Sequence, residues 1–250
     1  MVGQDVGTVR RSYQRRWLGI LIALLPSLAV AQSLPGLGSA DPRITVDPSL
    51  PPWNTVVRVQ VPGVSVCTGF MVTPTIALTA AHCLYGYRLG HFVPAGSIHL
   101  LSGYASGGFA RHAVVQSYRV APGYDPRAPD ATRGSDVAVL SAIFTDAAPS
   151  PIVVIGPTGD ATLALAGYSQ DRTQRLQIDP DCRGLGIIAD RSGTPLLWHS
   201  CAGTKGTSGG PILGKGADGR WSVVGLQSGA RPNERGGVAV TGATLRLLLN

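Results

Sequence analysis

The chain has 250 residues, of which 44% are hydrophobic and only 14% are charged, with 33 glycines and 19 prolines. This length and apolar content suffice for a sizeable core and exclude wholesale disorder, while so much glycine and proline favours a turn-rich β protein over a helical one. The net charge is +7, but beyond residue 31 the basic residues form no Lys/Arg run and no aromatic platform accompanies them. We therefore expect an ordinary solvated surface and no nucleic-acid partner.

The first 31 residues have the pattern of a secretory signal peptide. Four arginines precede an apolar run over residues 17–30, which ends in a small-x-small cleavage pattern at residues 29–31. A retained membrane anchor is the alternative, but the run is shorter than the ~20 residues of a span and Pro26 interrupts it. We predict cleavage after Ala31, export to the periplasm or the exterior, and no stable membrane association afterwards. The remaining chain has 17 basic and 13 acidic residues, a net charge of +4.

Residues 32–50 are rich in proline, glycine and serine, which indicates an extended N-terminal arm or a propeptide. Short β-type runs separated by turn residues then follow one another. The first set is expected at 55–61, 66–72, 76–80, 98–103, 112–120 and 136–142. The second set is expected at 163–169, 175–178, 185–188, 195–198, 211–214, 221–228 and 237–240.

A linker rich in alanine and proline at residues 145–151 separates the two sets. Two sets of about six strands predict two antiparallel barrels or sandwiches packed together, over residues 51–150 and 151–250. Parallel βαβ units are not expected, because no strong amphipathic helix lies between the strands. The best helical candidate is the end of the chain, at residues 243–249.

Export changes the meaning of the four cysteines, which in an oxidising compartment favour two disulfides over metal ligands. They allow three pairings, of which the local one, Cys67 with Cys83 and Cys182 with Cys201, closes two short loops. Zinc bound by these cysteines with His82 and His199 is the rival hypothesis. The chain has no C-x-x-C or H-x-x-x-H spacing at these positions, so we expect no metal and no cofactor.

The stretch "GTKGTSGGPIL" (203–213) places Ser208 in a glycine-rich loop. Glycines permit unusual backbone conformations and a close approach of substrate, and successive N–H groups around such a serine can point at one oxygen. The match to G-x-S-x-G suggests an α/β-hydrolase, whose histidine follows its serine. The five histidines are residues 82, 91, 99, 112 and 199, so none follows Ser208 and this interpretation fails.

The order histidine, aspartate, serine remains, and two further segments supply it. "LTAAHCL" places His82 at the end of an apolar strand, where a disulfide from Cys83 to Cys67 would hold its backbone. "GSDVAVL" places Asp136 just before another apolar strand. An exposed turn histidine and a strand-start aspartate are each common alone, but the ordered combination with Ser208 indicates a catalytic triad.

Together, "CTGFMVTPTIALTAAHC", "GSDVAVL" and "GTKGTSGGP" resemble the three catalytic blocks of the chymotrypsin/trypsin-like serine protease family over roughly residues 50–250. The stretch from Cys182 to Cys201 resembles the bacterial branch of the family, which includes glutamyl endopeptidases, more than it resembles animal trypsins. The resemblance implies two six-stranded antiparallel β-barrels with a short C-terminal helix, and a monomeric endopeptidase that acts on polypeptides.

By this resemblance Ser208 is the nucleophile, His82 is the general base and Asp136 orients the imidazole. The N–H groups of Gly206 and Ser208 would form the oxyanion hole, and Ser228 would line the cleft and support Asp136. The alternative is a protease-fold protein that has lost turnover and acts as a binding module.

Several positions depart from the family pattern. Thr207 stands where animal members have the aspartate that binds the new N-terminus after activation, so another contact must hold the Ser208 loop. Ala202, at the expected base of the specificity pocket, argues against selection for Lys or Arg. Gln227 replaces the histidine of glutamyl endopeptidases, and Gly229 replaces a bulky aromatic, which should widen the pocket. We expect a small or apolar residue before the scissile bond.

Overall fold

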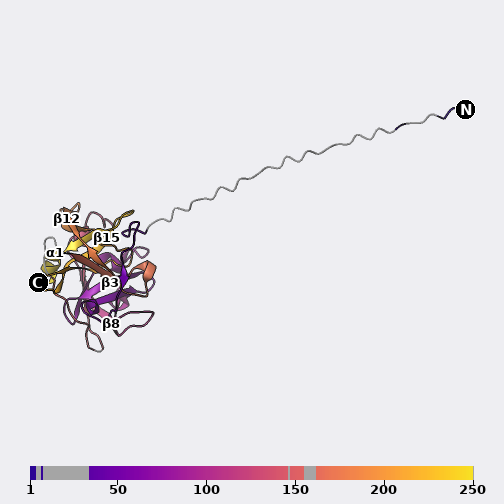
Figure 1. Cartoon of the computed structure of the whole chain (residues 1–250). Helices are drawn as coiled ribbons and strands as arrows, with labels where there is room; N and C mark the ends of the chain where they lie inside the picture. The colour runs from indigo at the N-terminus through magenta and orange to yellow at the C-terminus, as the bar shows by residue number, and fades with distance from the viewer. Residues whose placement is uncertain (4–6, 8–33, 146, 155–161, 250) are drawn as a thin grey trace. The chain divides into compact units, whose positions relative to one another are not determined.

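The six strands predicted in the first half of the chain close into an antiparallel β-barrel, in which Figure 1 labels β3 and β8. The structure, a computed structural model, describes residues 1–3, 7, 34–145, 147–154 and 162–249, so all but four residues of the predicted signal peptide lie outside the described residues. The strands follow the order β2, β3, β4, β9, β8, β7, and β7 pairs back to β2. Their bounds are β2 Val56–Val61, β3 Ser65–Met71, β4 Ile76–Thr79, β7 His99–Ser102, β8 Arg111–Val120 and β9 Ala138–Ala142.

Alternation along β2 divides its side chains between two apolar clusters. Val57 and Val59 belong to the main core of the barrel, whereas Val56 packs in a second cluster that includes Tyr168 from the other half of the chain. Successive side chains of a strand point to opposite faces, so one face of β2 fills the barrel and the other joins it to the second sheet.

The second half of the chain forms an eight-stranded antiparallel sheet, in which Figure 1 labels β12 and β15. Its order is β1, β11, β10, β14, β15, β16, β13, β12. Seven of these strands fall on predicted runs, and the eighth, β1 (Ile44–Thr45), comes from the N-terminal arm and pairs with β11. The others are β10 Leu163–Gly167, β11 Gln177–Cys182, β12 Gly184–Ala189, β13 Pro195–His199, β14 Pro211–Lys215, β15 Trp221–Ala230 and β16 Gly237–Thr241.

The all-β, chymotrypsin-like fold class is confirmed, and the predicted terminal helix is α1 (Gly242–Leu249). The second sheet exceeds the six strands implied by the resemblance, partly because the arm contributes one. Several elements were too short for periodicity to reveal. They are β5 Tyr85–Gly86, β6 His91–Phe92 and the 3-10 helices η1 Trp53–Thr55, η2 Ala81–Leu84, η3 Ala95–Ser97, η4 Arg133–Ser135 and η5 Gln170–Arg172.

Both local disulfides are formed, Cys67–Cys83 and Cys182–Cys201. Sulfur atoms of Cys67 and Cys83 lie within 4.8 Å of an imidazole nitrogen of His82, but they are bonded to each other and are not thiolates that could bind a metal. In the part of the chain that the structure describes, no helix is long and apolar enough to cross a bilayer.

Candidate active site

His82 is fixed by the element that carries it and by the disulfide beside it. The buried strand β4 leads into η2, whose Cys83 is bonded to Cys67 on β3. The hydroxyl of Ser65, also on β3, donates to the carbonyl of Cys83 at 2.6 Å. The backbone around His82 is therefore tied to the barrel wall, while its side chain remains 25% exposed.

Asp136 lies between η4 and β9 and is almost fully buried, with 2% exposure. Its Oδ2 lies 2.7 Å from His82 Nδ1, and its Oδ1 accepts from the His82 backbone N–H at 2.9 Å. The hydroxyl of Ser228, on β15, donates to Oδ2 at 2.5 Å. The carboxylate thus orients the imidazole ring through Nδ1 and leaves Nε2 free for proton transfer.

Opposing effects act on the pKa of Asp136. Burial raises it, but the charge of His82 and the hydrogen bonds from His82 and Ser228 outweigh burial and hold the pKa below its usual value. Asp136 is therefore a carboxylate at neutral pH, suited to stabilise a positive imidazole.

Ser208 lies in the loop between β13 and β14, packed against the barrel at Thr68 and Cys83. Its carbonyl accepts from the N–H of Thr68 at 2.9 Å and lies 3.9 Å from the sulfur of Cys83. The next residue, Gly209, has φ +81°, and a Cβ there would lie 2.2 Å from the Thr68 carbonyl oxygen. Within the described residues the Ser208 hydroxyl makes no hydrogen bond to His82, and such bonds are often long before substrate binds.

The backbone of the Ser208 loop leaves two N–H groups free. The N–H of Gly206 and that of Ser208 donate to no other group of the described chain, whereas the N–H groups of Thr207, Gly209 and Gly210 all have acceptors. Gly206 has φ +93°, and a Cβ there would lie 2.3 Å from the carbonyl oxygen of Tyr168. Only glycine fits this position, and two N–H groups without an acceptor in the described chain are what the predicted oxyanion hole would need.

Thr207 turns its side chain back into its own loop. It is buried, and its hydroxyl donates to the carbonyl of Thr204. The hydroxyl of Thr68 donates to the Gly206 carbonyl at 2.8 Å and accepts from Tyr168 N–H at 2.9 Å. The loop is thus held by neutral hydrogen bonds, two of them across the junction between barrel and sheet.

Ala202, the expected base of the specificity pocket, is buried against a charged pair that sequence reasoning missed. Its N–H donates to the carboxylate of Asp179 at 2.6 Å, and Arg235 donates to the same carboxylate at 2.8 Å. Asp179 is fully buried. Its charge is already matched by Arg235 and is not free to attract a cationic substrate side chain.

Gln227 is buried behind Ser228, and its Nε2 donates to the Gly229 carbonyl at 3.1 Å. His199 packs beside it, and the Nδ1 of His199 accepts from the N–H of Cys201 at 3.1 Å. Burial lowers the pKa of His199 to about 4, an effect that Gln227 partly offsets. His199 is therefore neutral at pH 7, in contact with the side chain of Gln227.

The space left open by Gly229 is filled by Arg133, another residue that sequence reasoning missed. A Cβ on Gly229 would lie 2.5 Å from the Arg133 guanidinium. Arg133 also donates to the carbonyl of Ser228 at 3.3 Å and pairs with Asp130. The guanidinium of Arg133, paired with Asp130, therefore lies at the wall that was expected to be open.

Comparison with known proteins agrees with this architecture. A family model described as trypsin-like peptidase domain matches residues 67–226, more than half of the chain. A solved structure of a Glu endopeptidase in complex with MPD is similar to this chain with a TM-score of 0.66 and 20% identity, over 85% of this chain and 97% of that chain. No curated protein matches the sequence.

Proposed function

The chain belongs to the trypsin-like peptidase family, and we propose that it is an exported serine endopeptidase that hydrolyses peptide bonds through an acyl-enzyme intermediate. The observation that carries this proposal is the hydrogen-bonded pair of His82 and Asp136, together with the Ser208 loop and its two free N–H groups. A peptidase of this class needs a base, a group that orients the base, a nucleophile and an oxyanion hole.

In the proposed mechanism the Ser208 hydroxyl attacks the scissile carbonyl carbon while Nε2 of His82 takes its proton. Asp136 keeps the imidazole in the required tautomer and stabilises the imidazolium. The N–H groups of Gly206 and Ser208 receive the negative charge of the tetrahedral intermediate, which is worth about 3 kcal/mol per donor. The imidazolium then protonates the leaving amine, and water attacks the acyl-enzyme by the same route.

We propose that the specificity is not for Lys or Arg. Ala202 offers no charge at the pocket base, the carboxylate of Asp179 is matched by Arg235, and Arg133 adds a positive charge beside Gly229. We propose a small or apolar residue before the scissile bond, because Ala202 brings no charge to the pocket base and Arg133 occupies the space beside Gly229. Gln227 and Ser228 would line the same cleft.

Export is proposed from the N-terminal pattern and supported by the two disulfides, which persist in oxidising compartments. The proposed organisation is a signal peptide at 1–31, an arm at 32–50, and two β-barrel units at 51–150 and 151–250. We expect a monomer with polypeptide substrates.

The test is digestion of a peptide library by the protein beginning near Gln32, with products read by mass spectrometry. Wild-type protein is expected to cleave, and Ser208→Ala is expected to lower kcat at least 10³-fold while retaining its fold. The rival function, a binding module without turnover, predicts that wild type and Ser208→Ala bind peptides equally and cleave none. Cleavage mainly after Lys or Arg would contradict the proposed specificity.

A further inference from the structure

The structure links the N-terminal arm to the peptide bond that aims one oxyanion donor. The carbonyl of Lys205 and the N–H of Gly206 belong to the same planar peptide unit. That carbonyl accepts from the N–H of Gln170 at 2.7 Å. Because the carbonyl and the N–H of a trans peptide point in opposite directions, holding the Lys205 oxygen toward Gln170 fixes the direction of the Gly206 N–H.

Gln170 is the first residue of η5, and the next two residues of η5 are clamped by charges on the arm. The Arg43 guanidinium donates to both carboxylate oxygens of Asp171, at 3.1 and 2.6 Å. Arg172 donates to Asp41 at 2.8 Å, and Asp41 also accepts from Arg43 at 2.8 and 2.9 Å. These four residues are called the arm clamp below.

The arm clamp is partly removed from solvent, which distinguishes it from an ordinary surface ion pair. The Arg43 side chain is 1% exposed, and those of Asp41 and Asp171 are 27% and 23% exposed. Burial lowers the pKa of Arg43, but its bonds to Asp41 and Asp171 outweigh burial and hold the pKa above its usual value. The pairing of β1 with β11 continues the attachment beyond Arg43.

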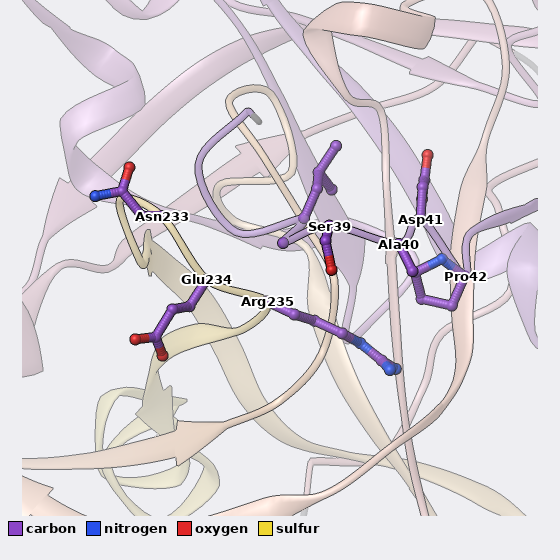
Figure 2. Close-up of a pocket in the computed structure, with 9 residues that line it drawn as sticks. Ser39, Ala40, Asp41, Pro42, Asn233, Glu234 and Arg235 are labelled. Atoms are coloured by element: carbon purple, nitrogen blue, oxygen red, sulfur yellow. The ribbon is translucent and has the colours of Figure 1, made fainter. Parts of the chain in front are cut away.

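A second anchor holds the start of the arm against the Ser208 loop. The N–H of Gly36 donates to the Arg231 carbonyl at 2.7 Å, and the Gly36 carbonyl accepts from Gly203 at 3.4 Å and from Gly236 at 3.1 Å. A Cβ on Gly36 would lie 2.0 Å from the Gly203 oxygen. Between the two anchors, arm residues 38–42 face residues 233–235 across a pocket (Figure 2).

We propose that Asp41 and Arg43 are positioning residues for the oxyanion hole, acting through η5 and the Gln170–Lys205 hydrogen bond. They would supply the charged contact that Thr207 cannot make, so the arm is a working part of the folded enzyme rather than a discarded propeptide. The catalytic part of this inference rests on the proposed function, since it assigns Gly206 as an oxyanion donor.

Replacing Gln170 by proline removes the N–H that holds the Lys205 carbonyl. Ser169 has φ −82° and ψ 147°, the extended conformation that suits a residue before proline, and the first residue of a helix tolerates proline. Gln170→Ala keeps the N–H and is the matched comparison. We expect kcat of Gln170→Pro to be about 10²-fold below that of Gln170→Ala, with KM within about twofold, because only transition-state binding is lost. Equal kcat values in two folded variants would overturn the inference.

The clamp itself is tested in the full chain with Arg43→Met, compared with Arg220→Met, which removes an exposed arginine paired with Asp218. Hydrogen exchange of the Gln170 amide is expected to accelerate at least tenfold in Arg43→Met and to stay unchanged in Arg220→Met, with Arg43→Lys intermediate. Unchanged exchange in folded Arg43→Met would refute the clamp.

The exchange measurement does not depend on turnover. A wild-type protein that cleaves nothing would contradict the proposed function. The exchange rate of the Gln170 amide would still show whether the arm holds the Lys205–Gly206 peptide unit. If Gln170→Pro does not fold, the comparison of Arg43→Met with Arg220→Met still decides whether the arm clamp holds the Gln170 amide.

Discussion

At the scale of single residues, the burial of His199 leads to a prediction about stability rather than catalysis. Its folded pKa of about 4 lies below the value of 6.5 for a free histidine. Between these values the unfolded chain binds a proton that the folded chain does not. The contribution of neutral His199 to the free energy of unfolding is therefore fully present above pH 6.5. It falls by about 3 kcal/mol as the pH is lowered toward 4.

His199→Asn keeps an acceptor for the N–H of Cys201 but cannot titrate. We expect its free energy of unfolding to decline by about 3 kcal/mol less than that of wild type between pH 6.5 and 4. Denaturant unfolding at a series of pH values measures this. Parallel declines in the two proteins would show that folding does not lower the pKa of His199.

Residues with strong local signatures could be proposed from the sequence, and residues defined by distant partners could not. His82, Asp136 and Ser208 lie in short recognisable blocks. Arg133 acquires its meaning only from Ser228, 95 residues away, and Asp179 only from Arg235, 56 residues away. Neither arginine differs from a solvated surface residue until the fold brings its partner to it.

At the scale of elements, the disulfide between β3 and η2 contributes to both stability and catalysis. Closing a loop of 16 residues is worth about 3 kcal/mol, so Cys67→Ala with Cys83→Ala should lower the free energy of unfolding by about that amount. Because Cys83 neighbours His82, kcat should fall as well. The pair Cys182→Ala with Cys201→Ala should cost a similar stability but raise KM, since Cys201 precedes Ala202. Unfolding curves and steady-state kinetics test both, and identical kinetic changes would contradict the assignment.

Most strands with alternating or continuous apolar residues were predicted to within about two residues of their ends, because burial imposes that pattern. β11 is the exception, since it ends at Cys182, four residues beyond the predicted run. The two-residue β1 carries no periodic signal. Its pairing with β11 depends on the Pro/Gly-rich arm returning across the second sheet, which composition alone could not indicate. The three-residue helix η5 likewise carries no periodic signal, although its Gln170 contacts the Ser208 loop at Lys205.

At the scale of the whole molecule, Thr68 joins the two halves beside the site. Thr68→Val keeps the shape but leaves the Tyr168 N–H and the Gly206 carbonyl without their partner. We expect a loss of about 3 kcal/mol in the free energy of unfolding and a lower kcat. Thr75→Val, at an exposed position of the same barrel, should change stability by less than about 0.5 kcal/mol. Equal unfolding energies for the two variants would contradict this role.

We propose that His82, Asp136 and Ser208 act as one nucleophilic centre. The most direct test is reaction of the folded protein with a sulfonyl fluoride, followed by peptide mapping by mass spectrometry. We expect a single adduct on Ser208 in the wild type and none in Ser208→Ala or His82→Ala. A folded wild-type protein left unlabelled at Ser208, or a Ser208→Ala variant labelled to the same extent, would contradict it.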